Sequence, residues 1–218
     1  MRITLPSGTP AELTRAEAPK RGVVVIPDIG GLRPLFDDLV AGLSSENSWN
    51  VIAPEPFPGR ESMALDERMG AMAGLDDATF LADVTAAADA LDVEPVAVIG
   101  FCMGGMYTMK AAATGRFDRA AAFYGMVRVP DGWRGPGQRN AVDCLNDAPG
   151  SAARVVAIVG TADPYTPAAE VDELEAAGAH VVRYADAEHG FVHDKSRPAH
   201  RADDAADAWR RVREWLTV

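Results

Sequence analysis

Cysteine is almost absent from this chain. Only Cys102 and Cys144 occur in 218 residues. A disulfide framework is therefore excluded as the main source of stability, and a reducing cytoplasm is the expected compartment. The first twenty residues lack the apolar core of a signal peptide. No apolar run approaches the roughly 18 residues that a transmembrane helix needs, so no membrane association is expected.

Positive charge is also scarce, with 21 Lys and Arg against 32 Asp and Glu, for a net charge of −11. Such a surface repels phosphate, and no stripe of Lys and Arg is visible, so nucleic acid is not an expected partner. Aromatic residues make up only 7%, but apolar residues reach 48% in all. That content excludes disorder for most of the chain and suits one large core. We expect a single domain over residues 1–218 that forms a monomer or a weak homodimer.

Short apolar runs alternate with helical patterns along the sequence. This alternation predicts an α/β fold with a mainly parallel central sheet and helices on both faces. Two strands near the N-terminus are expected to form a hairpin, and the most apolar runs are expected at the centre of the sheet. The expected strands are residues 2–5, 12–14, 22–26, 50–53, 96–99, 120–124, 155–159 and 181–184.

Helical periodicity follows most of these strands. Leu35, Leu39 and Leu43 predict the buried stripe of a first helix. Thr166, which precedes a proline, predicts the N-cap of a later helix that ends at Gly178. Other helices are expected at residues 76–91, from Cys102 to about residue 113, and at the C-terminus, whereas residues 54–74 are interpreted as a surface excursion and 127–150 as loop-rich.

Three polar residues stand just past the carboxyl ends of predicted parallel strands: Cys102, Asp163 and His189. Catalytic groups of open α/β sheets collect at that edge, and the order nucleophile, acid, histidine is that of the α/β-hydrolases. Residues Gly100–Gly104 match the G-x-S-x-G nucleophile elbow, with Cys in place of Ser. We therefore predict Cys102 as the nucleophile, His189 as the base that takes its proton and Asp163 as the acid that orients the imidazole.

The elbow also predicts where a reacting oxygen is stabilised. A helix that begins after Cys102 presents free N–H groups and a dipole that favour a thiolate. The Met103 N–H is expected to point at the carbonyl oxygen of a bound ester. A second donor is expected from the loop after the first central strand, at the Ile29 N–H. Each such donor increases the reaction rate by a factor of about 10²–10³.

These motifs resemble those of the dienelactone hydrolase family of α/β-hydrolases, also called carboxymethylenebutenolidases. The matching pieces are residues 25–31, Gly100–Gly105, 123–125, 160–164 and 189–191, and the resemblance runs from about residue 22 to 216. It implies an α/β-hydrolase fold, a Cys-His-Asp triad and no cofactor. It also implies hydrolysis of a small ester or enol-lactone through an acyl-thioester.

The chain departs from the family at residues that face the substrate. Asp28 stands where family members usually have a Glu, which is thought to hold the resting thiol. Family lactonases bind the substrate carboxylate with arginines; one position matches His193, and the other matches Gly70, near Arg68. Tyr124, at the end of a strand near the elbow, is a further candidate for the pocket. Asp28, Tyr124, Arg68 and His193 are the candidate substrate-binding residues, and we hypothesise a different or less charged ester.

The same residues are compatible with other functions. The same thiol could serve a thioesterase or a general carboxylesterase. It could also be a redox-sensitive thiol on a protein without hydrolytic activity. His189 and His193 have a spacing that suits a metal only on one helix face, and Gly190 disfavours a helix there, so no metal site is expected. Methionines near the elbow and in residues 54–74 are expected to form an adaptable apolar pocket, and Cys144 is expected to be structural.

Overall fold

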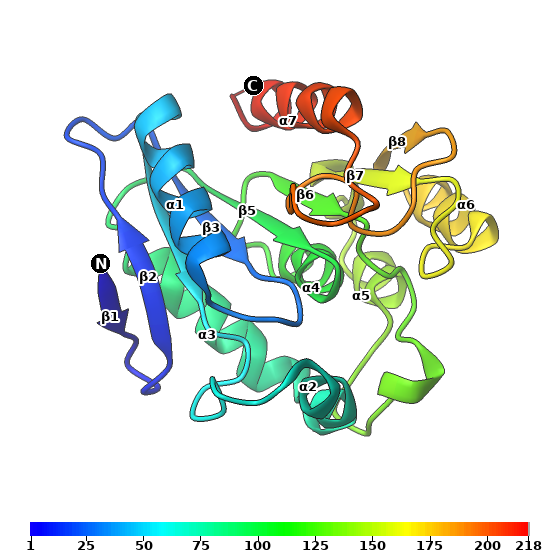
Figure 1. Cartoon of the computed structure of the whole chain (residues 1–218), viewed down its shortest axis with the longest axis horizontal. Helices are drawn as coiled ribbons and strands as arrows, with labels where there is room; N and C mark the ends of the chain where they lie inside the picture. The colour runs from blue at the N-terminus through cyan, green and yellow to red at the C-terminus, as the bar shows by residue number, and fades with distance from the viewer. Residues whose placement is uncertain (218) are drawn as a thin grey trace.

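A computed structural model describes residues 1–217 of the chain, which form one eight-stranded sheet with helices on both faces (Figure 1). The strand order is β1-β2-β4-β3-β5-β6-β7-β8. β1 pairs antiparallel with β2, and β2 with β4, whereas all other pairs are parallel. The predicted α/β class with a mainly parallel sheet is confirmed. The strands are β1 (Arg2–Thr4), β2 (Pro10–Thr14), β3 (Arg21–Ile26), β4 (Trp49–Pro54), β5 (Val96–Phe101), β6 (Ala120–Phe123), β7 (Val155–Gly160) and β8 (His180–Tyr184).

The sheet divides the core into two layers, and helices cover each of them. One apolar cluster lies between the sheet and α1 and α7, and the other lies between the sheet and α3, α4 and α5. Figure 1 shows α7 across the sheet from α4, with α2 set apart beyond the strands. Every residue of the central strands β3, β5, β6 and β7 is buried, as coverage of both faces requires. The helices are α1 (Pro34–Asn47), α2 (Leu65–Ala71), α3 (Asp77–Asp89), α4 (Met103–Ala112), α5 (Ala141–Asp147), α6 (Ala168–Ala176) and α7 (Ala202–Thr217), with 3₁₀ turns at Met72–Gly74, Asp131–Trp133 and Ala152–Arg154.

The buried face of α1 differs from the predicted one. Phe36, Val40 and Leu43 are buried, whereas Leu35 and Leu39 are half-buried. The predicted and the observed stripe are offset by one residue and share Leu43. The spacing of apolar residues alone therefore could not show which of the two faces the core. The Phe36 ring decides the rotation, because it packs against Phe101 of β5 with 5.9 Å between the ring centroids.

The predicted N-cap at Thr166 is wrong. Helix α6 begins at Ala168, and its N-cap is Pro167, whose extended ψ of 142° delays the helix by one residue. The Thr166 hydroxyl is buried and has no hydrogen-bond partner within residues 1–217. The helix does end where expected, because Gly178 adopts φ +104° and donates its N–H to the Glu175 carbonyl.

Two short helices lie in the segments interpreted as a surface excursion and as a loop-rich stretch. Helix α2 lies within residues 54–74, and α5, which carries Cys144, lies within residues 127–150. Helices of seven residues have weak sequence signals and depend on tertiary contacts, such as the burial of Arg68 on α2. Both cysteines are free and half-buried. Among the helices of residues 1–217, none is long and apolar enough to cross a membrane.

Candidate active site

Cys102 occupies a strained turn between β5 and α4. Its backbone has φ 57° and ψ −119°, a conformation that non-glycine residues rarely adopt and that is typical of a nucleophile elbow. A Cβ on Gly100 would lie 2.2 Å from the Gly104 carbonyl oxygen, and one on Gly104 would lie 2.2 Å from the Ile26 carbonyl oxygen. Because backbone passes this close on both sides, only glycine fits at the two positions that the motif predicts.

Asp163 and His189 come from the loops that follow β7 and β8. Nδ1 of His189 lies 2.8 Å from Oδ2 of Asp163, and the Asp163 side chain is fully buried. The other carboxylate oxygen of Asp163 accepts a hydrogen bond from the Tyr165 N–H at 2.8 Å. Cys102 and His189 line the same cavity, and Cys102 is among the groups that raise the pKa of the imidazole. The fold therefore brings together the three residues that the sequence singled out.

The surroundings of His189 favour its charged form. Burial disfavours the imidazolium, but the hydrogen bond to Asp163 and the neighbouring Cys102 outweigh it and raise the pKa of His189 to about 9. An imidazole poised in this way can hold the proton of a thiol and later deliver it to a leaving group.

The free energy of unfolding should fall as pH rises through this group. The folded pKa of about 9 lies above the ordinary value of 6.5, so the stabilisation is complete below 6.5 and is lost as pH approaches 9. A shift of this size corresponds to about 3 kcal/mol. Urea unfolding at about pH 6 and about pH 9.5 should show wild type losing that amount relative to His189→Gln, whose amide does not titrate. Equal losses in the two proteins would contradict the assignment.

The predicted oxyanion donors border the elbow. Met103 is the first residue of α4, where N–H groups have no intrahelical acceptor. Ile29 lines the cavity with Cys102, and its N–H has no hydrogen-bond acceptor among the described residues. The Ile29 N–H is therefore free to bind a ligand oxygen, and the role of both N–H groups as oxyanion donors stays a prediction.

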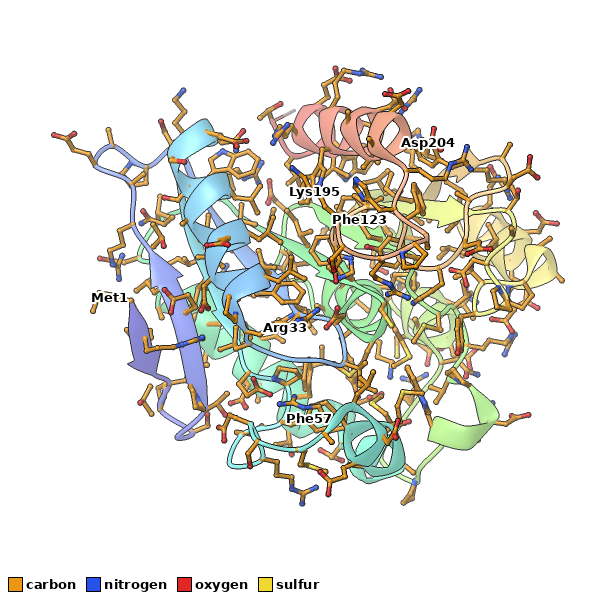
Figure 2. All side chains as sticks on the ribbon, in the orientation of Figure 1. Met1, Arg33, Phe57, Phe123, Lys195 and Asp204 are labelled. Atoms are coloured by element: carbon orange, nitrogen blue, oxygen red, sulfur yellow. The ribbon has the colours of Figure 1, made fainter. Side chains whose placement is uncertain are left out.

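The site opens into a cavity of about 740 Å³ at the carboxyl edge of the sheet. Figure 2 shows Arg33, one of the lining residues, near the start of α1, and Phe57 above α2. Three of the methionines, Met63, Met69 and Met126, line it together with Trp133, whereas Met72, Met103 and Met106 are buried in the core and do not. The apolar lining is Ile29, Met63, Leu65, Met69, Met126 and Trp133, and the charged lining is Asp28, Asp66, Asp194, Arg33, Arg68 and Arg197.

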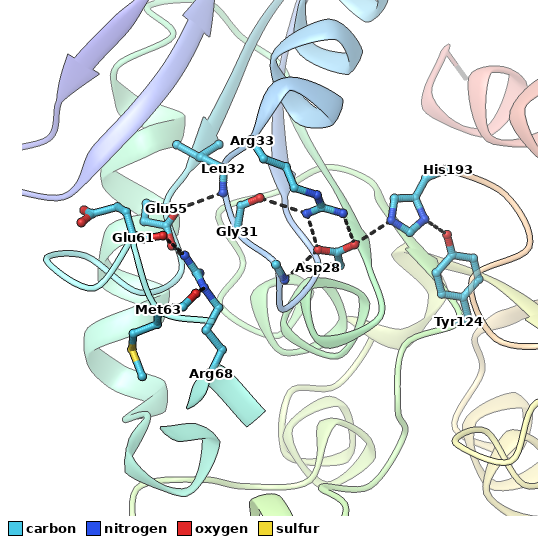
Figure 3. A network of polar contacts seen from close by, with 11 residues as sticks. Asp28, Gly31, Leu32, Arg33, Glu55, Glu61, Met63, Arg68, Tyr124 and His193 are labelled. Carbon is cyan, nitrogen blue, oxygen red and sulfur yellow. Dashed lines mark hydrogen bonds and ion pairs between the residues drawn. The ribbon is translucent and has the colours of Figure 1, made fainter. Parts of the chain in front are cut away.

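The four candidate substrate-binding residues separate into two groups. Asp28 and Arg68 line the cavity, whereas Tyr124 and His193 are buried and are not among its lining residues. His193 instead donates from Nε2 to Oδ2 of Asp28 at 2.8 Å, and the Tyr124 hydroxyl contacts its Nδ1 (Figure 3). A contact between Tyr124 or His193 and substrate therefore has no support in this geometry, because Asp28 stands between His193 and the cavity.

Sequence reasoning missed two residues of this network, Arg33 and Glu55. Arg33 binds both carboxylate oxygens of Asp28, at 2.6 and 2.8 Å. Burial raises the pKa of Asp28, but the hydrogen bonds of His193 and Arg33 outweigh it and hold the pKa far below its usual value. Glu55 forms a buried ion pair with Arg68 at 2.9 Å. Its position directly after β4 was a usable signal, because polar residues at that edge of the sheet belong to the site.

The two histidines of the H-x₃-H spacing have different partners. Residues 189–193 form turns rather than a helix, and the side chains of His189 and His193 bind Asp163 and Asp28 respectively. Within residues 1–217, no group of three or more His, Cys, Asp or Glu is arranged to hold a metal ion.

Comparison with known proteins agrees with this geometry. The profile of the dienelactone hydrolase family matches residues 10–218. Carboxymethylenebutenolidase from Rhodococcus opacus is 29% identical over 213 residues, which cover 89% of this chain and 79% of that protein. The structure of a candidate dienelactone hydrolase from Klebsiella pneumoniae subsp. pneumoniae MGH 78578 superposes with a TM-score of 0.84 at 25% identity and covers 100% of this chain and 97% of that one.

A more distant structure shares the fold alone. The alpha/beta hydrolase GrgF from Penicillium sp. sh18 gives a TM-score of 0.69 at 10% identity and covers 99% of this chain and 96% of its own. The expected α/β-hydrolase fold is thereby confirmed. The family match covers more than nine-tenths of the sequence and includes the elbow, Asp163 and His189. The chain belongs to the dienelactone hydrolase family and is a hydrolase of ester or lactone bonds.

Proposed function

We propose that this chain hydrolyses a small uncharged ester or lactone with Cys102 as nucleophile, His189 as acid–base and Asp163 as the group that orients His189. The observation that carries the proposal is the 2.8 Å contact between His189 and the buried Asp163, beside a cysteine held in a strained elbow. A cysteine without a catalytic role has no need for the strained backbone or for two flanking glycines.

The acylation step follows from this arrangement. His189 takes the Sγ proton, and the Cys102 thiolate attacks the carbonyl carbon. The resulting oxyanion lies between the N–H groups of Met103 and Ile29. The bond between carbon and the leaving oxygen then breaks, and the imidazolium protonates that oxygen. An acyl-thioester on Cys102 remains, and a lactone keeps its leaving alcohol tethered to the acyl group.

Deacylation reverses the proton transfers. His189 takes a proton from water, and the hydroxide attacks the thioester carbonyl. Collapse of the second tetrahedral intermediate releases the acid, and the imidazolium returns the proton to Sγ. Because a thiolate is a good leaving group, a lactone or an activated ester suits this site better than an amide.

The cavity supports an uncharged substrate. Three carboxylates and three guanidinium groups line it, so these six groups together carry no net charge. Arg33 is paired with Asp28, and Arg68 is paired with Glu55. The rest of the wall is largely methionine and aromatic side chains, which favour apolar groups.

A substrate panel tests this proposal. We expect kcat/KM for p-nitrophenyl acetate to exceed that of an aryl acetate with a ring carboxylate by about tenfold, since two of the three lining arginines are already paired with carboxylates. An uncharged enol-lactone should be turned over at least as well. Cys102→Ala is the blank for every substrate. A carboxylated dienelactone hydrolysed far faster than simple aryl esters would contradict the uncharged substrate class.

The same panel separates the other candidates. A strong preference for acyl-thioesters over oxygen esters would identify a thioesterase, and broad turnover without a lactone preference would indicate a general carboxylesterase. No turnover, combined with peroxide oxidation of Cys102, would indicate a redox-sensitive thiol protein.

We propose that the enzyme works in the cytoplasm as a monomer or weak homodimer. The mechanism above uses no cofactor, and the small ester is the only partner that it needs.

A further inference from the structure

The loop between β3 and α1, residues 27–33, carries the Ile29 N–H and is held by polar groups on two sides. We infer that these groups form a clamp that positions the Ile29 N–H as an oxyanion donor, with His193 as the residue that ties this loop to the loop of His189. This inference deepens the proposed function and rests on it. The loop clamp consists of Asp28, Arg33, His193 and Tyr124 on one side and of Glu55 and Arg68 on the other (Figure 3).

On the first side, Asp28 closes a turn around Ile29. Its Oδ1 accepts the Gly30 N–H at 2.9 Å, and its backbone carbonyl accepts the Gly31 N–H at 2.9 Å. The Ile29 peptide is enclosed by this turn, so its orientation depends on where the Asp28 carboxylate is held. Arg33 holds that carboxylate through both oxygens.

On the second side, Glu55 binds the end of the same loop. Its Oε2 accepts the Leu32 N–H at 2.8 Å, and its Oε1 accepts the Phe57 N–H at 3.0 Å and Nη1 of Arg68 at 2.9 Å. The side chains of Glu55 and Arg68 are only 0% and 3% exposed. Salt in the solvent therefore screens their attraction little. The loop is therefore fixed at both ends of the segment that holds Ile29.

His193 connects this loop to the acid–base loop. It lies four residues after His189, and its ring stacks on Phe101 with the centroids 4.8 Å apart. Because the ionised Asp28 can only accept a hydrogen bond, Nε2 of His193 carries the proton. The Tyr124 hydroxyl contacts the other ring nitrogen, Nδ1. Both ring nitrogens therefore have partners, which fixes the orientation of the ring and the position of Asp28.

The clamp acts on the transition state rather than on ground-state binding. An oxyanion donor matters when the carbonyl oxygen gains charge, and an error of about 1 Å in its position can cost up to 10²-fold in rate. Loss of His193 should therefore lower kcat and leave KM nearly unchanged. Alkylation of Cys102 by iodoacetamide needs the thiolate but no oxyanion hole, so it reports on the triad alone.

Four variants test the inference with p-nitrophenyl acetate and iodoacetamide. His193→Ala should lower kcat about 10–100-fold, with KM and the alkylation rate each within about twofold of wild type. His193→Gln keeps a donor for Asp28 and should recover most of kcat. Arg33→Met, at a side chain that is 31% exposed, removes the other partner of Asp28 and should give the same signature even if His193→Ala does not fold. His180→Ala, an exposed histidine on β8, is the matched control and should behave as wild type.

Three results would overturn the clamp. Unchanged kcat in both His193→Ala and Arg33→Met would remove any positioning role. A parallel fall of kcat and alkylation rate would show that His193 supports the triad itself, and no recovery of kcat in His193→Gln would show that the hydrogen bond to Asp28 is not what matters. Failure of the proposed function is seen separately, as full turnover by Cys102→Ala.

Discussion

Cys102→Ala should lower kcat/KM for p-nitrophenyl acetate by about 10⁴-fold or more, because it removes the atom that forms the acyl bond. Oxyanion donors and binding groups remain, so a small residual rate above water is expected. Cys102→Ser should be less impaired, since its hydroxyl occupies the same elbow, but about 10²-fold slower than wild type, because an alcohol does not ionise as a thiol does.

Cys144→Ala is the matched control for this loss. Cys144 lies on α5, is half-buried and is not among the cavity-lining residues, so its removal should leave kcat/KM unchanged. Electrospray mass spectrometry of the quenched reaction should show one acetyl group on wild type and none on Cys102→Ala. Retention of wild-type turnover by Cys102→Ala would rule out the thiol mechanism altogether.

Gly104→Ala should reduce the free energy of unfolding by about 3 kcal/mol or more. The new Cβ would lie 2.2 Å from the Ile26 carbonyl oxygen and 2.4 Å from that of Pro27, and both of these atoms are backbone. Neither can turn aside as a side chain does, so α4 must move away from the end of β3. That movement also separates Cys102 from Ile29, and kcat should fall with stability.

Gly70→Ala is the comparison for this substitution. Gly70 lies within α2, and a Cβ there meets nothing within 4 Å. Alanine at such a position should stabilise the helix by about 0.5–1 kcal/mol, because glycine loses more backbone entropy on folding. Urea unfolding followed by circular dichroism measures both changes. If Gly104→Ala unfolded at the wild-type urea concentration, α4 would have to pack more loosely on β3 than the structure shows.

Much of the architecture could be predicted from local patterns. The central strands are rich in Val, Ile and Ala, and they are recognisable because burial on both faces favours apolar side chains. The elbow was recognisable for a related reason: two glycines flank Cys102 where backbone passes too close for any Cβ. Asp163 and His189 follow from the rule that polar residues after parallel strands meet at one edge.

The network around Asp28 could not be predicted in the same way. Its partner His193 is 165 residues away in sequence, and no local pattern indicates that their side chains meet. Tyr124 and His193 were expected in the pocket, yet both lie buried behind Asp28. Helix α2 and the burial of Arg68 depend in turn on Glu55, on a different element.

The sequence by itself determined the sheet, the elbow and the three residues at its edge, because backbone sterics and apolar burial act over a few neighbouring positions. Only the tertiary structure decided which charges pair, and so which residues face the cavity and which hold its walls. A buried charge is stable only beside a partner that packing brings to it, and here that packing joins loops from opposite ends of the chain.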